Sequence, residues 1–320
     1  MRPVTFLLWA LASTYLWIGC ASEKRSEDDK TGAQPAGRDP ATAIRPALSK
    51  RAIGTKVSKA SRMMSIRALG TEVLDEGDHV DILVFIKDPM TGMEVTKTLL
   101  EDIPVALEGP KPDEIGVQVL PGEAELLALG QQSGTLQISL RNPDNTDKQN
   151  APCRATIETL FTGQRTKALK MQRLQTIQLE AIRDEASGKE DAHDQKVRVS
   201  HRIHKRGRAL VLPVMGAEMA ANGDHVDILV TLENPKSKSP VAITAMTNLI
   251  VLSVEQGKIC VLVLPQEAEI LFLASQLGQL LLTLRNPGDL DEQSDHTWTN
   301  IETLLTGKRP ILLKKRESTL

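Results

Sequence analysis

The sequence predicts an α+β fold in which one β-rich domain with one main helix occurs twice in tandem. The octapeptide GDHVDILV stands at Gly77–Val84 and again, unchanged, at Gly223–Val230, and the matches VLP with EAE, RNP and IETL follow in the same order. The first match is offset by 223 − 77 = 146 residues and the later ones by 263 − 119 = 144, which places the length difference in the Pro-rich stretch Glu108–Ile115. A length change confined to a loop indicates that a folded unit was duplicated whole.

Three strand patterns open each copy. After a Gly-Asp turn, Val80, Ile82 and Val84 alternate with Asp81 and Leu83, and this period of two is typical of a β-strand. Two further segments are β-branched and apolar and predict strands as well: Thr98–Leu107 and Gly116–Leu120, with counterparts at Thr244–Val254 and Lys258–Leu264.

A helix is predicted to begin at Pro121. Proline is tolerated in a first helical turn, Glu123 and Glu125 favour the positive end of the helix, and Gly134 predicts a left-handed stop. The same signals recur in copy 2 at Pro265, Glu267, Glu269 and Gly278. Because the second helix is apolar almost all round, we expect it to be buried on more than one side. A last strand follows each helix and ends at Asn-Pro: Thr135–Arg141 and Gln279–Arg285.

These patterns give a domain map for the 320 residues. We expect a signal peptide with a lipobox at 1–20, a disordered tether at 21–58, the first domain at 59–171, a linker with a short helix at 172–206 and the second domain at 207–315. The tether is rich in charged and small residues and cannot bury enough apolar surface to offset its ordering entropy.

The N-terminal segment resembles a bacterial export signal. Val4–Ile18 is an almost unbroken apolar run, shorter than the roughly 20 residues that a membrane span needs. Gly19 and Cys20, followed by a polar segment, resemble a lipobox, in which the cysteine is acylated, although Trp17 departs from the usual Leu. A simple secretory signal and an uncleaved anchor are the alternatives. Ala21 favours the outer membrane by resemblance to lipoprotein sorting, with the inner membrane as the alternative.

The composition argues against some classes of partner. The 39 basic and 41 acidic residues nearly balance, so no basic excess indicates nucleic-acid binding. Aromatic residues form only 2% of the chain, which leaves few stacking platforms for bases or sugars. Cys153 and Cys260 stand at unrelated positions of the two copies, and we interpret them as buried small hydrophobic residues, with an inter-copy disulfide as the alternative.

The sequence contains no recognisable catalytic, cofactor-binding or zinc-binding motif, and we assign no catalytic, cofactor or metal residue. The best candidate is Asp78-His79-Val80-Asp81, repeated as Asp224-His225-Val226-Asp227, in which a His between two carboxylates could bind a metal or act as a base. Strand alternation instead points His79 and Asp78 to opposite faces, so we interpret the group as a structural turn.

Two other polar groups have structural interpretations as well. His201 and His204 stand three residues apart, which on a helix would let them share a metal, but they lie in a basic linker segment and are interpreted as solvated. Arg141 and Arg285 recur at a strand end, where each could bind a carboxylate of a partner. We expect each to pair within its own copy.

The ordered motifs resemble a known family. GDHVDILV, TLLEDIPVALEG, VQVLPGEAELLALGQQSGTLQISLRNPDN and IETLFTGQR are similar to the periplasmic domain of the Flp pilus assembly protein CpaB/RcpC family of the Tad (tight adherence) secretion system. Copy 2 matches through Gly223–Val230, Leu249–Leu252, Pro265–Leu277, Gln279–Asp289 and Gly307–Arg309, and both copies together cover about two thirds of the chain. Members of the family usually carry an N-terminal β-clip domain, of which only a remnant at Ala52–Met64 is expected here.

The resemblance implies a non-enzymatic component of Flp/Tad pilus assembly and secretion, an envelope lipoprotein held at Cys20. Its expected partners are the outer-membrane secretin and other assembly proteins, with an oligomer where the partner is ring-shaped, and we expect no nucleic acid and no cofactor. A lipid-anchored periplasmic module that binds glycan or peptidoglycan is the alternative, and an enzyme with a divergent active site is the third hypothesis.

Overall fold

The computed structural model describes residues 60–108, 111, 113–145, 147, 154–187, 198–286 and 298–306. Copy 1 contains β1 (Arg62–Arg67), β2 (His79–Lys87), β3 (Glu94–Glu108), β4 (Glu114–Val119), α2 (Pro121–Ser133), β5 (Gly134–Arg141), β6 (Arg154–Thr156) and α3 (Ile157–Thr162). The connection between the copies contains α4 (Gln164–Ser187) and a 3-10 turn (Val199–Arg202). Copy 2 contains β7 (Arg208–Pro213), a 3-10 turn (Ala217–Met219), β8 (His225–Glu233), β9 (Pro240–Glu255), β10 (Lys258–Val263), α5 (Pro265–Leu277), β11 (Gln279–Leu284), β12 (Trp298–Asn300) and α6 (Ile301–Thr306).

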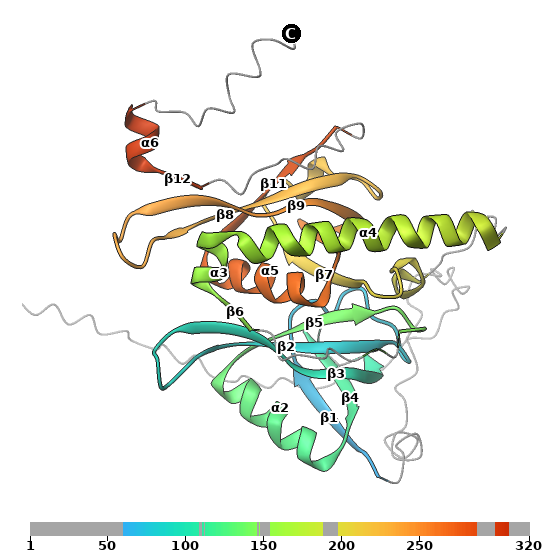
Figure 1. Ribbon diagram of the computed structural model, residues 1–320. Helices are drawn as coiled ribbons and strands as arrows, with labels where there is room; N and C mark the ends of the chain where they lie inside the picture. Colours follow the sequence, from blue (N-terminus) through green and yellow to red (C-terminus); the bar gives the residue numbers. More distant parts are fainter. Residues whose placement is uncertain are drawn as a thin grey trace, which may run out of the picture. The chain divides into compact units, whose positions relative to one another are not determined.

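The strands form one continuous antiparallel path that runs through both copies. Their order is β1-β4-β3-β2-β5-β7-β10-β9-β8-β11, with β6 paired to β3 and β12 paired to β9 (Figure 1). The prediction of a β-rich α+β fold is confirmed. The copies meet where β5 pairs with β7, in the register Ser139↔Leu210, Leu140↔Ala209 and Arg141↔Arg208. The predicted boundaries of two separate domains stay a prediction, because the sheet continues across the junction.

Helix α5 is buried between the two copies. It packs on β7, β8, β9 and β11 of its own copy and on β2, β3 and β6 of copy 1, and Figure 1 shows it between these two groups of strands, with α4 alongside. Phe272 is fully buried there, with its ring edge-on to Phe85 of copy 1 at 6.4 Å between centroids. The expectation that this helix is buried on more than one side is therefore confirmed.

Strand β2 shows why the copies share a core. Val80, Ile82 and Val84 pack into the cluster built mainly from copy 1, as their alternation predicts. Leu83, on the opposite face, is 1% exposed and packs into the cluster that contains Phe272. Both faces of β2 are thus covered by apolar side chains, one of them by the other copy.

The predicted left-handed stop at Gly134 is wrong. Gly134 and Gly278 have φ values of −168° and −163°, which is extended backbone that any residue adopts. Glycine is needed for a different reason, which is a close approach of two chains. A Cβ at Gly134 would lie 2.0 Å from the carbonyl oxygen of Phe85, and one at Gly278 would lie 2.2 Å from that of Thr231.

We expect Gly134→Ala to lower the free energy of unfolding by about 1–3 kcal/mol, because β5 must move away from the β2 backbone to admit the methyl group. Urea denaturation measures the effect. The matched control is Gly122→Ala in α2, where a Cβ meets no atom within 4 Å and helix propensity favours alanine. Equal stability of the two variants would contradict the packing explanation.

The connection between the copies differs from the expected short helix within 172–206. Helix α4 is 24 residues long and begins at Gln164, directly after Gly163 ends α3 in the left-handed conformation. Its early residues are held by packing, since Leu169 is buried in the same cluster as α5. Of the expected remnant at Ala52–Met64, residues 52–59 lie outside the described residues, and its end is the start of β1 (Arg62–Arg67), the counterpart of β7.

Candidate functional site

The repeated octapeptide begins with a turn that only certain residues can make. Gly77 and Gly223 have φ values of 92° and 90°, which lie in the left-handed region that favours glycine. The carboxylate of Asp78 accepts a hydrogen bond from the amide of Asp75 at 2.9 Å. In copy 2, the carboxylate of Asp224 accepts one from the amide of Ala221 at 2.8 Å. The predicted Gly-Asp turn is confirmed in both copies.

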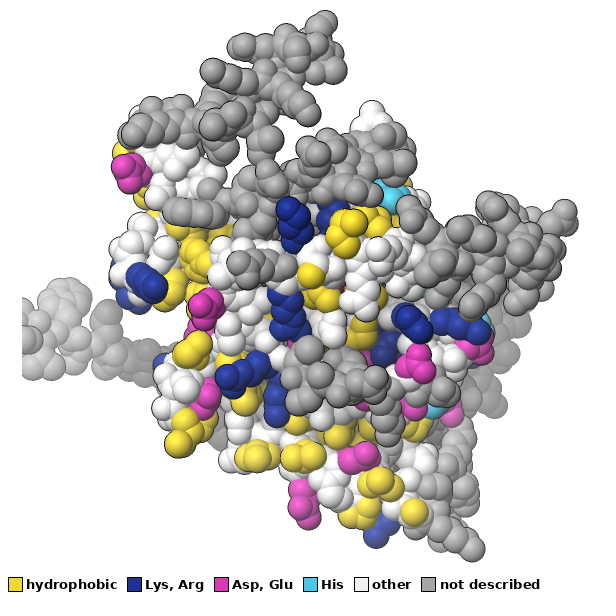
Figure 2. All heavy atoms as spheres, viewed as in Figure 1, with side chains coloured by type: hydrophobic (Ala, Val, Ile, Leu, Met, Phe, Trp, Pro, Cys, Tyr) yellow, Lys and Arg dark blue, Asp and Glu magenta, His cyan; other side chains and the backbone are white. Residues whose placement is uncertain are grey.

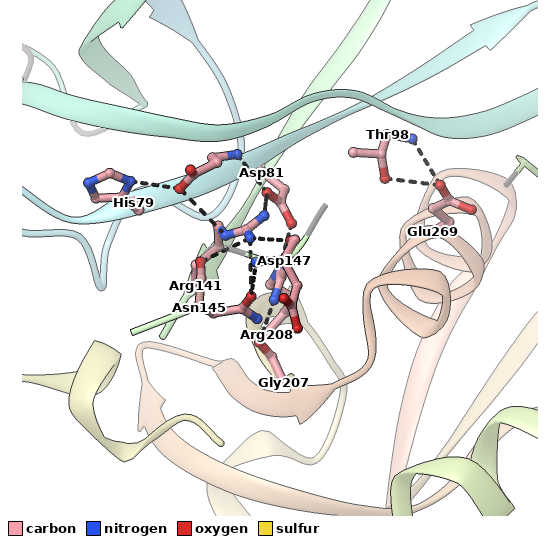
Figure 3. Close-up of polar contacts among 10 residues, drawn as sticks. His79, Asp81, Thr98, Arg141, Asn145, Asp147, Gly207, Arg208 and Glu269 are labelled. Atoms are coloured by element: carbon pink, nitrogen blue, oxygen red, sulfur yellow. Dashed lines mark hydrogen bonds and ion pairs between the residues drawn. The ribbon is translucent and has the colours of Figure 1, made fainter. Parts of the chain in front are cut away.

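The repeated His and Asp brace a bulge in the neighbouring strand. Nδ1 of His79 lies 2.8 Å from Oδ1 of Asp102, and Oδ1 of Asp81 accepts the amide of Asp102 at 3.0 Å (Figure 3). Asp102 has a φ of 62°, and the register between β2 and β3 shifts beside it. In copy 2, His225 lies 2.6 Å from the side chain of Asn248, which has a φ of 56°. Left-handed non-glycine residues need such support.

This geometry favours the structural interpretation of Asp78, His79 and Asp81. The first carboxylate holds the turn, the imidazole holds the bulge, and the second carboxylate faces two arginines. They do not converge on one point. In the part of the chain that the structure describes, no three or more His, Cys, Asp and Glu residues lie together as a metal site.

Asp81 is the centre of a buried ionic network that joins the copies. Its Oδ1 accepts Nη1 of Arg141 at 2.6 Å, and its Oδ2 accepts Nε of Arg208 from copy 2 at 2.5 Å (Figure 3). Arg141 also donates Nη2 to the carbonyl oxygens of Asn145 at 3.0 Å and Asp147 at 2.6 Å. Burial lowers the pKa of Arg208, and the facing Asp81 carboxylate opposes that shift. Each side chain of the ionic triad is at most 3% exposed.

The expectation that Arg141 and Arg285 pair within their own copies is confirmed. Arg285 donates Nη1 to both carboxylate oxygens of Asp227, at 3.1 and 3.3 Å. Arg208, which sequence reasoning missed, is the residue that turns the first of these local pairs into a link between copies.

Two glutamates of α5 make a second link. Oε1 of Glu269 accepts the amide and the hydroxyl of Thr98, both at 3.0 Å (Figure 3). Its Oε2 accepts Nη2 of Arg165 at 3.2 Å. Oε1 of Glu267 accepts Nη1 of Arg173 in α4 at 2.6 Å. Both glutamate side chains are fully buried, so copy 1 and α4 hold α5 through charged contacts as well as apolar ones.

Glu269 gives the stability of the protein a testable pH dependence. Burial raises its pKa above the usual value of 4.5, and the bonds from Thr98 and Arg165 oppose that shift only in part. The folded state therefore binds more protons than the unfolded state as pH rises above about 4.5, so the contribution of Glu269 to stability declines over that range.

We expect Glu269→Gln to remove this decline, so that the stability of the variant relative to the original chain increases between pH 4.5 and pH 7. Urea unfolding at several pH values measures it. Glu125→Gln, at the corresponding exposed position of α2, is the matched control. If the stability curves of Glu269→Gln and the original chain run parallel, the assigned burial effect is wrong.

Two surface cavities lie outside the ionic network. One of about 520 Å³ is bordered by β1, β5 and the carboxylates of Asp113 and Glu114, which pair with Arg67. Hydrogen bonds from Lys111 and Arg67 hold the pKa of Glu114 below its usual value. The other, of about 310 Å³, reaches Cys260, whose burial raises the pKa of its thiol to about 12 and keeps it protonated. Within the described residues, the thiol of Cys260 is therefore not an activated nucleophile.

The structure describes some of the remaining histidines and cysteines singled out in the sequence and does not describe others. His201 is exposed in a 3-10 turn, as its interpretation as a solvated residue requires, whereas His204 is half-buried and meets that interpretation only in part. Cys260 is buried with a free thiol. Cys20, with the predicted signal and tether, and Cys153 lie outside the described residues. Within the described residues, none of the helices has the length and apolar character needed to cross a membrane.

Comparison with known proteins gives no relative: no family model, no curated protein and no solved structure matches the chain.

Proposed function

We propose that the chain is a non-enzymatic component of Flp/Tad pilus assembly and secretion. In this proposal it is an envelope lipoprotein, anchored through Cys20 in the outer membrane, and its two copies contact the secretin or other assembly proteins. The observation that carries the proposal is the ordered set of motifs similar to the CpaB/RcpC family, which occurs in both copies.

The roles of the repeated residues support a binding rather than a catalytic function. Gly77, Asp78, His79 and Asp81 shape a turn, a bulge and an ion pair, and each has a counterpart with the same kind of role in copy 2. What was duplicated is therefore a set of structural contacts. Two linked copies can hold a partner more strongly than one, because binding by the first raises the local concentration of the second.

Co-purification tests the proposed partner. The full chain with an affinity tag is extracted from the native envelope, and the secretin is quantified in the purified material. An unrelated outer-membrane lipoprotein with the same tag is the control. We expect the secretin to be enriched only with this chain, and removal of the gene to reduce pilus export. Unchanged export together with no enrichment would overturn the proposal, and retention on purified murein instead would favour the peptidoglycan-binding alternative.

The anchor has its own test. Cys20→Ala removes the only side chain that the proposed lipobox can acylate, so we expect the variant to leave the outer-membrane fraction while the original chain stays in it. Metabolic labelling with a fatty acid supplies the direct reading. Equal labelling of both chains would contradict acylation at Cys20.

A further inference from the structure

We propose that this protein associates head to tail with further copies of itself, by pairing the outer edge of β11 in one molecule with β1 of the next. The contact repeats between molecules the β5–β7 junction that joins the two copies within one chain. The inference goes beyond the proposed function and does not depend on it.

Strand β1 is the counterpart of β7 residue by residue. In copy 1, Arg62 pairs with Val119 of β4, and in copy 2 Arg208 pairs with Val263 of β10. Since Val119 and Val263 occupy the same position of the repeat, Arg62 occupies the position of Arg208. Strand β7 pairs with the edge of β5, whereas β1 lies at one end of the strand order.

Strand β11 is correspondingly the counterpart of β5, and its edge is exposed where that of β5 is covered. Leu140 pairs with Ala209 and is 1% exposed, but its counterpart Leu284 is 45% exposed. Within the described residues, β11 pairs along its length with β8 and stands at the other end of the strand order. Its outer edge carries the single bridge of Leu281 to Met215, as β5 carries that of Gln137 to Leu69, and beyond this bridge no described strand pairs with the edge at Thr283 and Leu284. An unpaired strand edge is a template for another chain.

The carboxylate of Asp227 lies at this edge, at the position that corresponds to Asp81 of the inner junction. Asp81 divides its two oxygens between Arg141 and Arg208 and is 3% exposed. Asp227 directs both oxygens to Arg285 and is 22% exposed. In the register of the inner junction, Arg62 of a second molecule falls beside Asp227, which supplies charge complementarity to the strand pairing.

The outer face of α2 gives a second, independent indication of the contact, because it is exposed where the counterpart residues of α5 are buried. Leu126 and Leu129 are 48% and 61% exposed, whereas their counterparts in α5, Ile270 and Leu273, are fully buried. Figure 2 shows hydrophobic side chains gathered on the lower part of the visible surface, where α2 lies in Figure 1. Helix α5 also packs against β3, β6 and α3 of copy 1. Head-to-tail pairing would bring their counterparts β9, β12 and α6 of the neighbouring molecule over α2.

The contact between molecules is weaker than the one within the chain. The ring pair Phe85–Phe272 has Thr231 and Ala128 at the corresponding positions, so the aromatic contact is lost. The two strands also lack the covalent connection that holds β5 and β7 together. We therefore expect association that depends on protein concentration. Because each molecule offers two different edges, the contact is heterologous and produces a ring or a filament.

Three substitutions test the contact in the full chain, with sedimentation velocity in detergent as the measurement. Arg62→Glu blocks the β1 end by placing a carboxylate against Asp227. Leu284→Pro blocks the β11 end, since the amide of Leu282 donates to Met215 and that of Arg285 to His225, which leaves the Leu284 amide facing away from β8. Lys236→Glu is the control for charge, because its counterpart Met90 is 91% exposed and lies outside the inner junction.

We expect the original chain and Lys236→Glu to form larger species as the concentration rises, and each of the two blocked variants to sediment as a monomer with an unchanged circular dichroism spectrum. An equimolar mixture of Arg62→Glu and Leu284→Pro should form dimers and nothing larger, since only one intact edge of each kind remains. A monomer at every concentration of the original chain, or blocked variants that associate like the control, would overturn the proposal.

Discussion

Asp81→Ala should be the most destabilising single substitution in the ionic network, with a loss of about 3–5 kcal/mol in the free energy of unfolding. The change leaves Arg141 and Arg208 buried without their shared carboxylate, and it also removes the acceptor that holds the amide of Asp102 in the bulge. Such a penalty comes from uncompensated buried charge and not only from lost attraction. Urea denaturation followed by circular dichroism measures it.

The second copy supplies the control. Asp227→Ala makes the same change where the carboxylate is 22% exposed and pairs with one arginine, Arg285, in place of two, so fewer buried charges lose their partner. We expect Asp227→Ala to lose distinctly less free energy of unfolding than Asp81→Ala. If both variants lose the same amount, burial at the junction between the copies does not set the energy of the network.

Arg173→Ala should cost a similar amount, about 3–5 kcal/mol, by breaking a buried ion pair from one side. Arg173 is one of the contacts that hold α4 on copy 2, since it donates to Glu267 at 2.6 Å and to the carbonyl oxygen of Thr247 at 2.7 Å. We expect faster hydrogen exchange in α4 together with the lower free energy of unfolding. Gln172→Ala, at the exposed neighbouring position, is the matched control.

A double variant separates charge from packing. Arg173→Ala with Glu267→Gln removes both charges while Gln can still accept the amide of Leu264 that Glu267 now caps at 2.8 Å. We expect it to be more stable than Arg173→Ala. A double variant as unstable as the single one would show that the loss comes from helix packing and not from a buried carboxylate.

Local patterns in the sequence were sufficient to predict the positions of the strands and the main helices. The alternation of Val80, Ile82 and Val84 and the proline with its acidic neighbours are signals within a few residues, and β2, α2 and their counterparts form where these signals stand. Glu123 also caps the amide of Leu120 at 2.7 Å, as an acidic residue in a first turn should.

Contacts between distant residues could not be predicted in this way. The local sequence around Arg208 does not indicate that it pairs with Asp81, which is 127 residues away. The same holds for Thr98 and Glu269, which are 171 residues apart. The local context of Gly134 predicts a helix stop, whereas the constraint on this residue is the backbone of β2. The one signal that could have identified Arg208 is Arg62 at the same repeat position, in a strand otherwise different in sequence.

Native-state hydrogen exchange at two corresponding amides tests the central claim, that the duplicated contacts join the copies and leave an equivalent edge open at the end. The amide of Leu140 faces β7 and that of Leu284 faces outward from β11. In the Arg62→Glu background, where a second molecule does not cover β11, we expect Leu140 to exchange only with global unfolding and Leu284 to exchange orders of magnitude faster. Equal protection of the two amides, or rapid exchange at Leu140, would contradict the account.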